Sequence, residues 1–227
     1  MTGGETASKI APVRQGGRTP QRRLQLILFA TAVLAAIFLY RSVLHYMLDY
    51  SIASFGTYWP HRGRLLIHLS GGTIALVTGL FQLWSGLRMR FPSFHRWIGR
   101  VYLASVAIGT FAGLWLAFTP AFGLPYGVAL GGLALAWSGC TLMGYLAIRN
   151  RLVAAHRRWM IRAHVTTFAF VIYRALEIIL YGAGATDVAA TEIFAAWACW
   201  TIPLGTTVLI ERVQDKRRQP AAATGSR

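Results

Sequence analysis

Two copies of a short motif rich in histidine and arginine occur in the chain with the same internal spacing. In each copy Arg-x-Arg is followed, after four residues, by His-Arg; the copies are Arg88, Arg90, His95 and Arg96, and Arg149, Arg151, His156 and Arg157. Imidazole nitrogens can ligate haem iron, and guanidinium groups bind carboxylates and phosphates in a bidentate manner. Each copy lies between two long apolar runs, which predicts a basic turn on one side of a membrane.

Further ionisable residues lie inside apolar runs, where charge is costly and normally faces the interior of a helix bundle. His68 and Gln82 share one helical stripe, and His164, Arg174 and Glu177 share another. Their depths predict an outer group of His68, Arg174 and Glu177, and an inner group of Gln82, His95, His164 and His156. Around the inner group we expect a basic ring of Arg88, Arg96, Arg100, Arg157 and Arg162.

Each group has a structural and a functional interpretation. In the outer group, either Arg174 and Glu177 neutralise each other with His68 as a hydrogen-bonded neighbour, or the three residues form a proton-relay or quinone-type site. In the inner group, either the His-Arg pairs meet lipid phosphates or the histidines bind a cofactor. Lipid contact accounts well for His156 and poorly for His164, which lies deeper in its apolar run.

Composition indicates how these groups are positioned. Of the 227 residues, 55% are hydrophobic and 13% are charged, with 23 Lys and Arg against 7 Asp and Glu. A soluble domain carries roughly 25% charged residues, so lipid must replace much of the polar surface. The basic residues are confined to gaps between apolar runs, which is typical of a membrane protein and argues against nucleic acid as a partner.

Six apolar stretches are long enough to span a bilayer, which takes about 20 residues. They are Leu24–Leu44, Leu65–Leu87, Trp97–Phe118, Tyr126–Ile148, Trp159–Tyr181 and Thr191–Ile210. We therefore predict an all-α polytopic membrane protein, with a six-helix transmembrane domain at residues 24–212. A disordered basic tail is expected at residues 1–23 and a basic C-terminal tail at 213–227.

The distribution of Lys and Arg predicts the orientation. The N-terminal tail, the loops that carry the two motifs and the C-terminal tail are all basic, whereas Thr119–Pro125 and Gly182–Ala190 contain no Lys or Arg. The positive-inside rule then places both termini in the cytoplasm. The longest external segment, Tyr46–Arg64, is either a plain connector or a cap over a pocket.

Small residues at helical spacing predict how the spans associate, because helices in lipid pack where backbones approach closely. Gly71, Ala75 and Gly79 are four apart in the second span, and Ser105, Gly109 and Gly113 repeat the pattern in the third. Spans two to five are thus expected to form a four-helix bundle. The two cysteines, Cys140 and Cys199, lie within apolar runs and are interpreted as small packing residues.

The chain resembles a family of bacterial multi-pass membrane proteins catalogued as domain of unknown function 2306. The resemblance rests on Gly79-Leu-Phe-Gln82, Arg88, His95-Arg-Trp-Ile-Gly-Arg-Val-Tyr102, His156-Arg-Arg-Trp-Met-Ile-Arg162 and Arg174, and covers roughly residues 64–180. The first and last spans add nothing to it. The resemblance implies a small polytopic protein of the inner membrane and implies no activity.

Three functional hypotheses remain open. The first is a membrane electron-transfer protein that binds haem b, with cofactor ligands among His68, His95, His156 and His164, and with His95 and His164 as the pair best matched in depth. The second is a proton-coupled carrier, or a protein that binds an anionic lipid or small anion. The third is an accessory subunit of a membrane complex. The bilayer, a membrane redox partner or quinone, and a second copy of the chain are the candidate partners; no metal beyond haem iron is expected.

Overall fold

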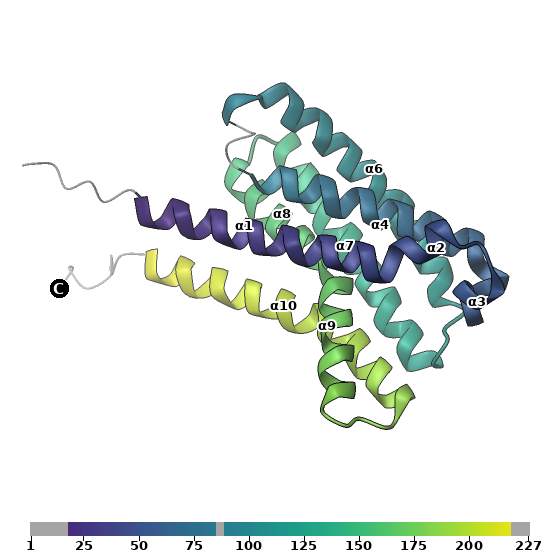
Figure 1. The fold of residues 1–227 in the computed structure, drawn as a ribbon. Helices are drawn as coiled ribbons and strands as arrows, with labels where there is room; N and C mark the ends of the chain where they lie inside the picture. The colour runs from purple at the N-terminus through teal and green to yellow at the C-terminus, as the bar shows by residue number, and fades with distance from the viewer. Residues whose placement is uncertain (1–17, 85–88, 219–227) are drawn as a thin grey trace, which may run out of the picture.

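The computed structural model describes residues 18–84 and 89–218, and Arg88 of the predicted basic ring lies outside them. Every regular element in these two ranges is a helix (Figure 1). In chain order they are α1 (Arg18–Phe38), η1 (Leu39–Val43), α2 (Leu44–Leu48), α3 (Ile52–Phe55), η2 (Gly56–His61), α4 (Arg62–Leu83), α6 (Pro92–Ala117), α7 (Leu124–Arg149), α8 (Val153–Thr167), α9 (Ala169–Gly182) and α10 (Val188–Arg218). The predicted all-α fold is confirmed.

Within the described ranges, five helical stretches are long and apolar enough to cross a membrane. They are Gln25–Leu48, Ile52–Leu83, Pro92–Ala117, Leu124–Arg149 and Val188–Arg217, and the bent pair α8 and α9 forms a sixth. Each of the six predicted spans overlaps one of these stretches; the last residues of the second span, 85–87, lie outside the described part. Helix α1 begins at Arg18, before the predicted first span, and α10 continues to Arg218, beyond the predicted last span. The rest of the predicted tails, residues 1–17 and 219–227, lies outside the described part.

The centre of the molecule is the four-helix bundle expected from spans two to five. Helix α4 packs along α6, α6 along α7, and α7 along α8. Glycine makes the first of these contacts close: a Cβ atom on Gly71 would lie 2.9 Å from both the amide nitrogen of Gly109 and the carbonyl oxygen of Ser105. The small-residue stripes of the second and third spans therefore meet each other, as helices in lipid require.

The fifth span differs from the single helix predicted for Trp159–Tyr181. Helix α8 ends at Thr167, α9 begins at Ala169, and their axes differ by 41°. No proline or glycine lies at this break, but the hydroxyls of Thr166 and Thr167 both donate to the carbonyl oxygen of Ala163, at 2.9 and 2.7 Å. Threonine side chains that bond back to their own helix in this way bend it.

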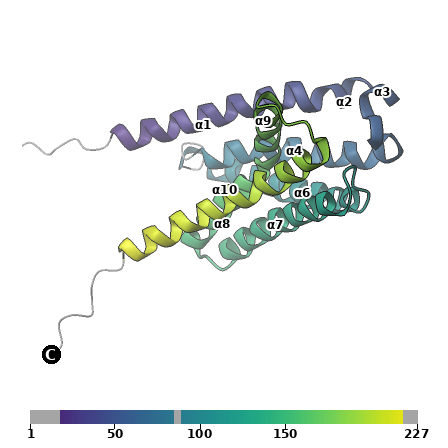
Figure 2. The same ribbon diagram turned by 90° about the horizontal axis from the view of Figure 1, so that it is seen from below.

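The bend turns α9 across the direction of the other long helices. It runs vertically in Figure 1 and is seen almost end-on in Figure 2. At its far end a short loop leads into α10, which packs against α9 and α7. The first span is also interrupted, since η1 is a π-helical segment between α1 and α2. Both interruptions lie where a cavity opens, and π segments are common beside functional sites.

The end of the bundle that carries the basic motifs is also the end where α1 starts and α10 finishes (Figure 1). Two ion pairs hold α10 to α8 there: Arg158 Nη1 lies 2.9 Å from Asp215 Oδ2, and Arg162 pairs with Glu211. Both termini of the described chain thus lie on one side of the bundle. We call this side the basic end and the other side the loop end.

Candidate functional site

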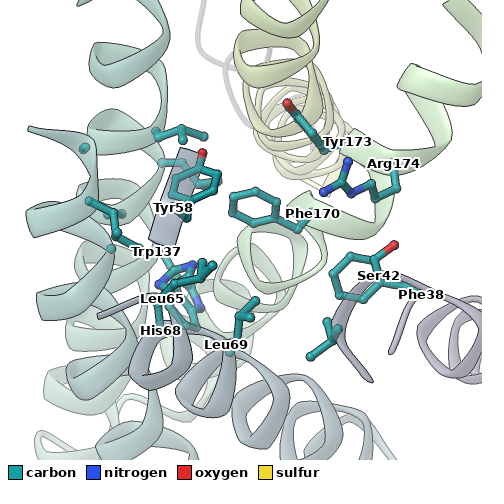
Figure 3. A pocket seen from close by; sticks show the side chains of 18 of the residues that line it. Phe38, Ser42, Tyr58, Leu65, His68, Leu69, Trp137, Phe170, Tyr173 and Arg174 are labelled. Atoms are coloured by element: carbon teal, nitrogen blue, oxygen red, sulfur yellow. The ribbon is translucent and has the colours of Figure 1, made fainter. Parts of the chain in front are cut away.

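A cavity of about 320 Å³ lies in the half of the bundle nearest the loop end. Residues of η1, α2, η2, α4, α6, the α6–α7 loop, α7, α8, α9 and α10 border it, together with Phe38 at the end of α1. Figure 3 shows Phe38 and Ser42 on one side, Leu65, His68 and Leu69 of α4 on another, and Phe170 and Arg174 of α9 facing them. All three residues of the predicted outer group, His68, Arg174 and Glu177, line this one cavity.

His68 is oriented by the backbone of α6. Its Nδ1 lies 2.8 Å from the carbonyl oxygen of Gly109, and a Cβ atom on Gly113 would lie 2.9 Å from the imidazole ring. A carbonyl oxygen can only accept, so Nδ1 carries the proton and Nε2 of the neutral ring is an acceptor. Because His68 lines the cavity, this nitrogen is the polar group it offers to a ligand.

Arg174 and Glu177 form the ion pair that their spacing predicts. Arg174 Nη1 donates to both carboxylate oxygens of Glu177, at 2.9 and 2.7 Å, one turn along α9. The Glu177 side chain is 12% exposed and that of Arg174 is 44% exposed. His68 does not join this pair, since its hydrogen bond goes to α6; the three residues share the cavity instead of one hydrogen-bonded cluster.

A second carboxylate faces the same space. Glu192 of α10 is buried, accepts a hydrogen bond from Tyr181 Oη at 2.9 Å, and accepts another from Tyr173. The hydroxyl of Tyr173 lies 3.2 Å from that of Tyr126 on α7. Glu192 also lies within electrostatic reach of Glu177. The cavity therefore has two carboxyl groups and one guanidinium along its α9 and α10 side.

Polar contacts also fix the floor of the cavity at the α8–α9 break. The hydroxyl of Thr167 accepts from Trp137 Nε1 at 2.8 Å and lies 2.9 Å from the hydroxyl of Tyr102. This one side chain joins α6, α7 and α8 just before Phe168, where the chain bends. The position from which α9 departs is thereby set by two other helices.

Three of the four residues of the predicted inner group, Gln82, His95 and His164, lie around the basic end of α4, outside the cavity. Gln82 Nε2 donates to the carbonyl oxygen of His95 at 2.7 Å, and a Cβ atom on Gly79 would lie 3.1 Å from His164 Nδ1. Neither ring nitrogen of His164 has a hydrogen-bond partner within residues 18–84 and 89–218. His156 is elsewhere, with its Nδ1 2.8 Å from the carbonyl oxygen of Gly144 on α7.

The described members of the basic ring have different environments. Arg96, Arg100 and Arg157 are exposed at the starts of α6 and α8, whereas Arg162 is half-buried against Glu211. That these exposed arginines meet lipid phosphates stays a prediction. Arg162 instead ties α8 to α10, a structural role that the sequence pattern did not indicate.

The four candidate haem ligands do not border one common space. His68 lines the cavity, and His95, His156 and His164 are absent from its lining. His156 uses its Nδ1 to anchor α8 on α7, and the His164 ring packs against Gly79 and Phe168. A bis-histidine haem between His95 and His164 needs a flat gap between the two rings. The prediction of such a haem stays a prediction.

The sequence profile of a family described as predicted membrane protein, DUF2306, matches residues 65–210. The chain belongs to this family. The match runs beyond the predicted resemblance of residues 64–180 and includes most of α10, so the expectation that the last span adds nothing is wrong. Neither the curated proteins nor the solved structures contain a match to the chain.

The DUF2306 match includes the main polar side chains of the cavity, from His68 to Glu192, whereas η1 and η2 lie before it. Sequence reasoning missed Glu192 and the tyrosines bonded to it. Glu192 lies inside the predicted span Thr191–Ile210, and an acidic residue at that depth is itself a signal of function. The sequence also left open whether Tyr46–Arg64 is a connector or a cap. Two residues of this segment, Tyr46 and Tyr58, line the cavity. This segment therefore caps the cavity.

Proposed function

We propose that this DUF2306 membrane protein binds a neutral aromatic amphiphile of the quinol class in the cavity at its loop end. The observation that carries the proposal is a largely apolar, aromatic-lined cavity that is shared by His68, whose Nδ1 is bonded to Gly109, and by the carboxyl groups of Glu177 and Glu192. Pockets for small molecules are concave, mostly apolar and carry a few oriented polar groups. A volume of about 320 Å³ falls within the range typical of such pockets.

The polar groups suit a ligand that donates hydrogen bonds. His68 Nε2 is an acceptor for a ligand hydroxyl, and the two carboxyl groups are further acceptors. A quinol has two hydroxyls on a flat ring, which Phe170 and Trp137 can contact by stacking or edge-on packing.

The charges argue against an anion in this cavity. Arg174 is the cation that lines it, and its guanidinium is already bonded to Glu177. Glu192 adds a second carboxyl group, so a carboxylate or phosphate ligand would meet repulsion. The alternative of anionic-lipid or small-anion binding therefore applies better to Arg96, Arg100 and Arg157 at the basic end than to the cavity.

Isothermal titration of the detergent-purified protein with decylubiquinol tests the proposal. We expect saturable binding to the wild type and about tenfold weaker binding to His68→Phe, the effect of losing one hydrogen bond to a polar ligand. His61→Gln is the control, because His61 lies close by in η2 and does not line the cavity. Equal affinity for the wild type and His68→Phe, or tighter binding of dodecyltrimethylammonium or a fatty acid, would contradict the proposal.

We also infer the membrane and the orientation from the charge pattern. The positive-inside rule puts the basic end, and with it both termini, in the cytoplasm of a bacterial inner membrane. The cavity then lies in the outer leaflet. Fusions of alkaline phosphatase and of a fluorescent protein to the C-terminus test this: fluorescence without phosphatase activity is expected, and the reverse would overturn it.

One observation favours haem as a second candidate ligand. An imidazole whose Nδ1–H donates to a backbone carbonyl while Nε2 stays open is held as metal-bound histidines are held. His68 would supply a single axial ligand, and the cavity would have to admit the macrocycle. Absorption spectra of the purified protein, oxidised and reduced, test this: a Soret band lost in His68→Phe is expected, and its absence after expression with added haem removes the candidate.

A further inference from the structure

We propose that Glu192, acting through a chain of tyrosine hydroxyls, makes the cavity selective for the reduced, hydroxyl-bearing form of its ligand. The inference rests on the proposed quinol-binding function and deepens it, because it assigns the residues that discriminate between quinol and quinone. Glu192, Tyr173 and Tyr126 all line the cavity. None of them belongs to the groups that the sequence pattern singled out.

The direction of each hydrogen bond follows from the number of protons available. Tyr173 and Tyr181 each donate to one oxygen of Glu192, so both oxygens act as acceptors, as they do in the ionised form. A phenol has one proton, and that of Tyr173 is used on Glu192. The contact of 3.2 Å between Tyr126 and Tyr173 is then a bond that Tyr126 donates.

The hydroxyl protons of Tyr126, Tyr173 and Tyr181 therefore point toward Glu192. Tyr126 is also hydrogen-bonded to Tyr58 of η2, and since the proton of Tyr126 is used on Tyr173, Tyr58 is the donor in that bond. The oxygen of Tyr58 is then left with acceptor capacity only, and because Tyr58 lines the cavity, a ligand can meet this oxygen. His68 Nε2 is likewise an acceptor. Two acceptors in one cavity complement the two hydroxyls of a quinol, whereas the carbonyl oxygens of a quinone would meet lone pairs.

The surroundings of Glu192 stabilise this direction of the tyrosine hydrogen bonds. Glu192 is 6% exposed and forms no ion pair with any described residue; its direct partners are the two tyrosine donors and the side chain of Glu177. Glu177 lies within its electrostatic reach, and Arg174 binds Glu177. A carboxylate that accepts two charge-assisted hydrogen bonds holds their donors more firmly than a neutral acceptor does.

The experiment compares the dissociation constants of decylubiquinol and decylubiquinone, measured anaerobically by isothermal titration. The wild type is expected to prefer the quinol by about tenfold or more, the effect of one hydrogen bond within a charged network. Glu192→Gln can donate from its amide, so the chain can reverse and the ratio should fall toward one. Tyr173→Phe interrupts the chain between Tyr126 and Glu192 and should lower the ratio in the same way.

A control variant and the pattern of outcomes separate the two proposals. Tyr40→Phe is the control, because Tyr40 lies in η1, is 73% exposed and does not line the cavity. Its ratio should equal that of the wild type. If the wild type binds neither compound, the proposed function itself fails. If the wild type binds both equally, or if Tyr173→Phe and any folded Glu192→Gln protein keep the ratio, the role of Glu192 is overturned while ligand binding stands.

Discussion

The imidazole of His68 lies against the backbone of Gly113, so closely that a Cβ atom at that glycine would lie 2.9 Å from both Nδ1 and Cε1 of the ring. Glycine on α6 thus makes the room that a histidine on α4 occupies. The carbonyl oxygen of Gly109, one turn earlier on α6, holds the same ring by a hydrogen bond of 2.8 Å. The orientation of His68 in the cavity is therefore set by α6 and not by its own helix.

Gly113→Ala tests this relationship. The added methyl group should displace the His68 ring, weaken its bond to Gly109 and reduce decylubiquinol affinity by about tenfold, the effect of one lost hydrogen bond. Isothermal titration measures the affinity. Gly139→Ala on α7 is the matched control, because a Cβ atom there has nothing within 4 Å. Unchanged affinity in Gly113→Ala would show that the ring has no fixed position.

The contact between α4 and α6 should tolerate a methyl group at one glycine and not at its neighbour. Gly71→Ala places a Cβ atom 2.9 Å from backbone atoms of α6, which cannot yield as a flexible side chain could. We expect a loss of about 1–3 kcal/mol in unfolding free energy, the usual cost of overpacking. Gly72→Ala meets nothing within 4 Å and should be neutral. Denaturation of both variants by sodium dodecyl sulfate measures the difference, and equal losses would contradict the close approach.

Thr167 should contribute more to the free energy of unfolding than a threonine that bonds only to its own helix. Thr167→Val removes the acceptor of Trp137 Nε1 and one of the partners of the buried Tyr102 hydroxyl. Buried polar groups left without a partner cost about 1–3 kcal/mol each. Thr201→Val is the control, since the hydroxyl of Thr201 bonds only to its own helix, at Trp197, and is exposed. Thermal unfolding in detergent should show a clear drop for the first variant alone.

Because of the ion pair on α9, replacing Arg174 alone should destabilise the protein more than replacing Arg174 and Glu177 together. Arg174→Leu leaves the carboxylate of Glu177, which is 12% exposed, without its cation. We expect this variant to lose more unfolding free energy than Arg174→Leu combined with Glu177→Gln, because the double change leaves no unpaired charge. The sodium dodecyl sulfate titration also suits this comparison. Losses of the same size from both proteins would mean that the pair contributes little.

Sequence alone predicted the features that depend on local composition and spacing. The six spans follow from the lengths of the apolar runs, and the meeting of Gly71 with Gly109 follows from small residues four apart in two neighbouring spans. The Arg174–Glu177 pair is a contact within one turn, so its spacing was sufficient. The common end reached by both termini follows from an even number of spans.

Tertiary structure decided what depends on contacts between distant segments. The bend before Ala169 has no proline or glycine to announce it, because hydroxyls of Thr166 and Thr167 cause it and two other helices hold it in place. The partners of Glu192 come from α9 across the loop, and the hydrogen bond of His68 comes from α6. A cavity forms where several helices leave a gap in their packing, and the spacing of residues along one segment cannot predict such a gap.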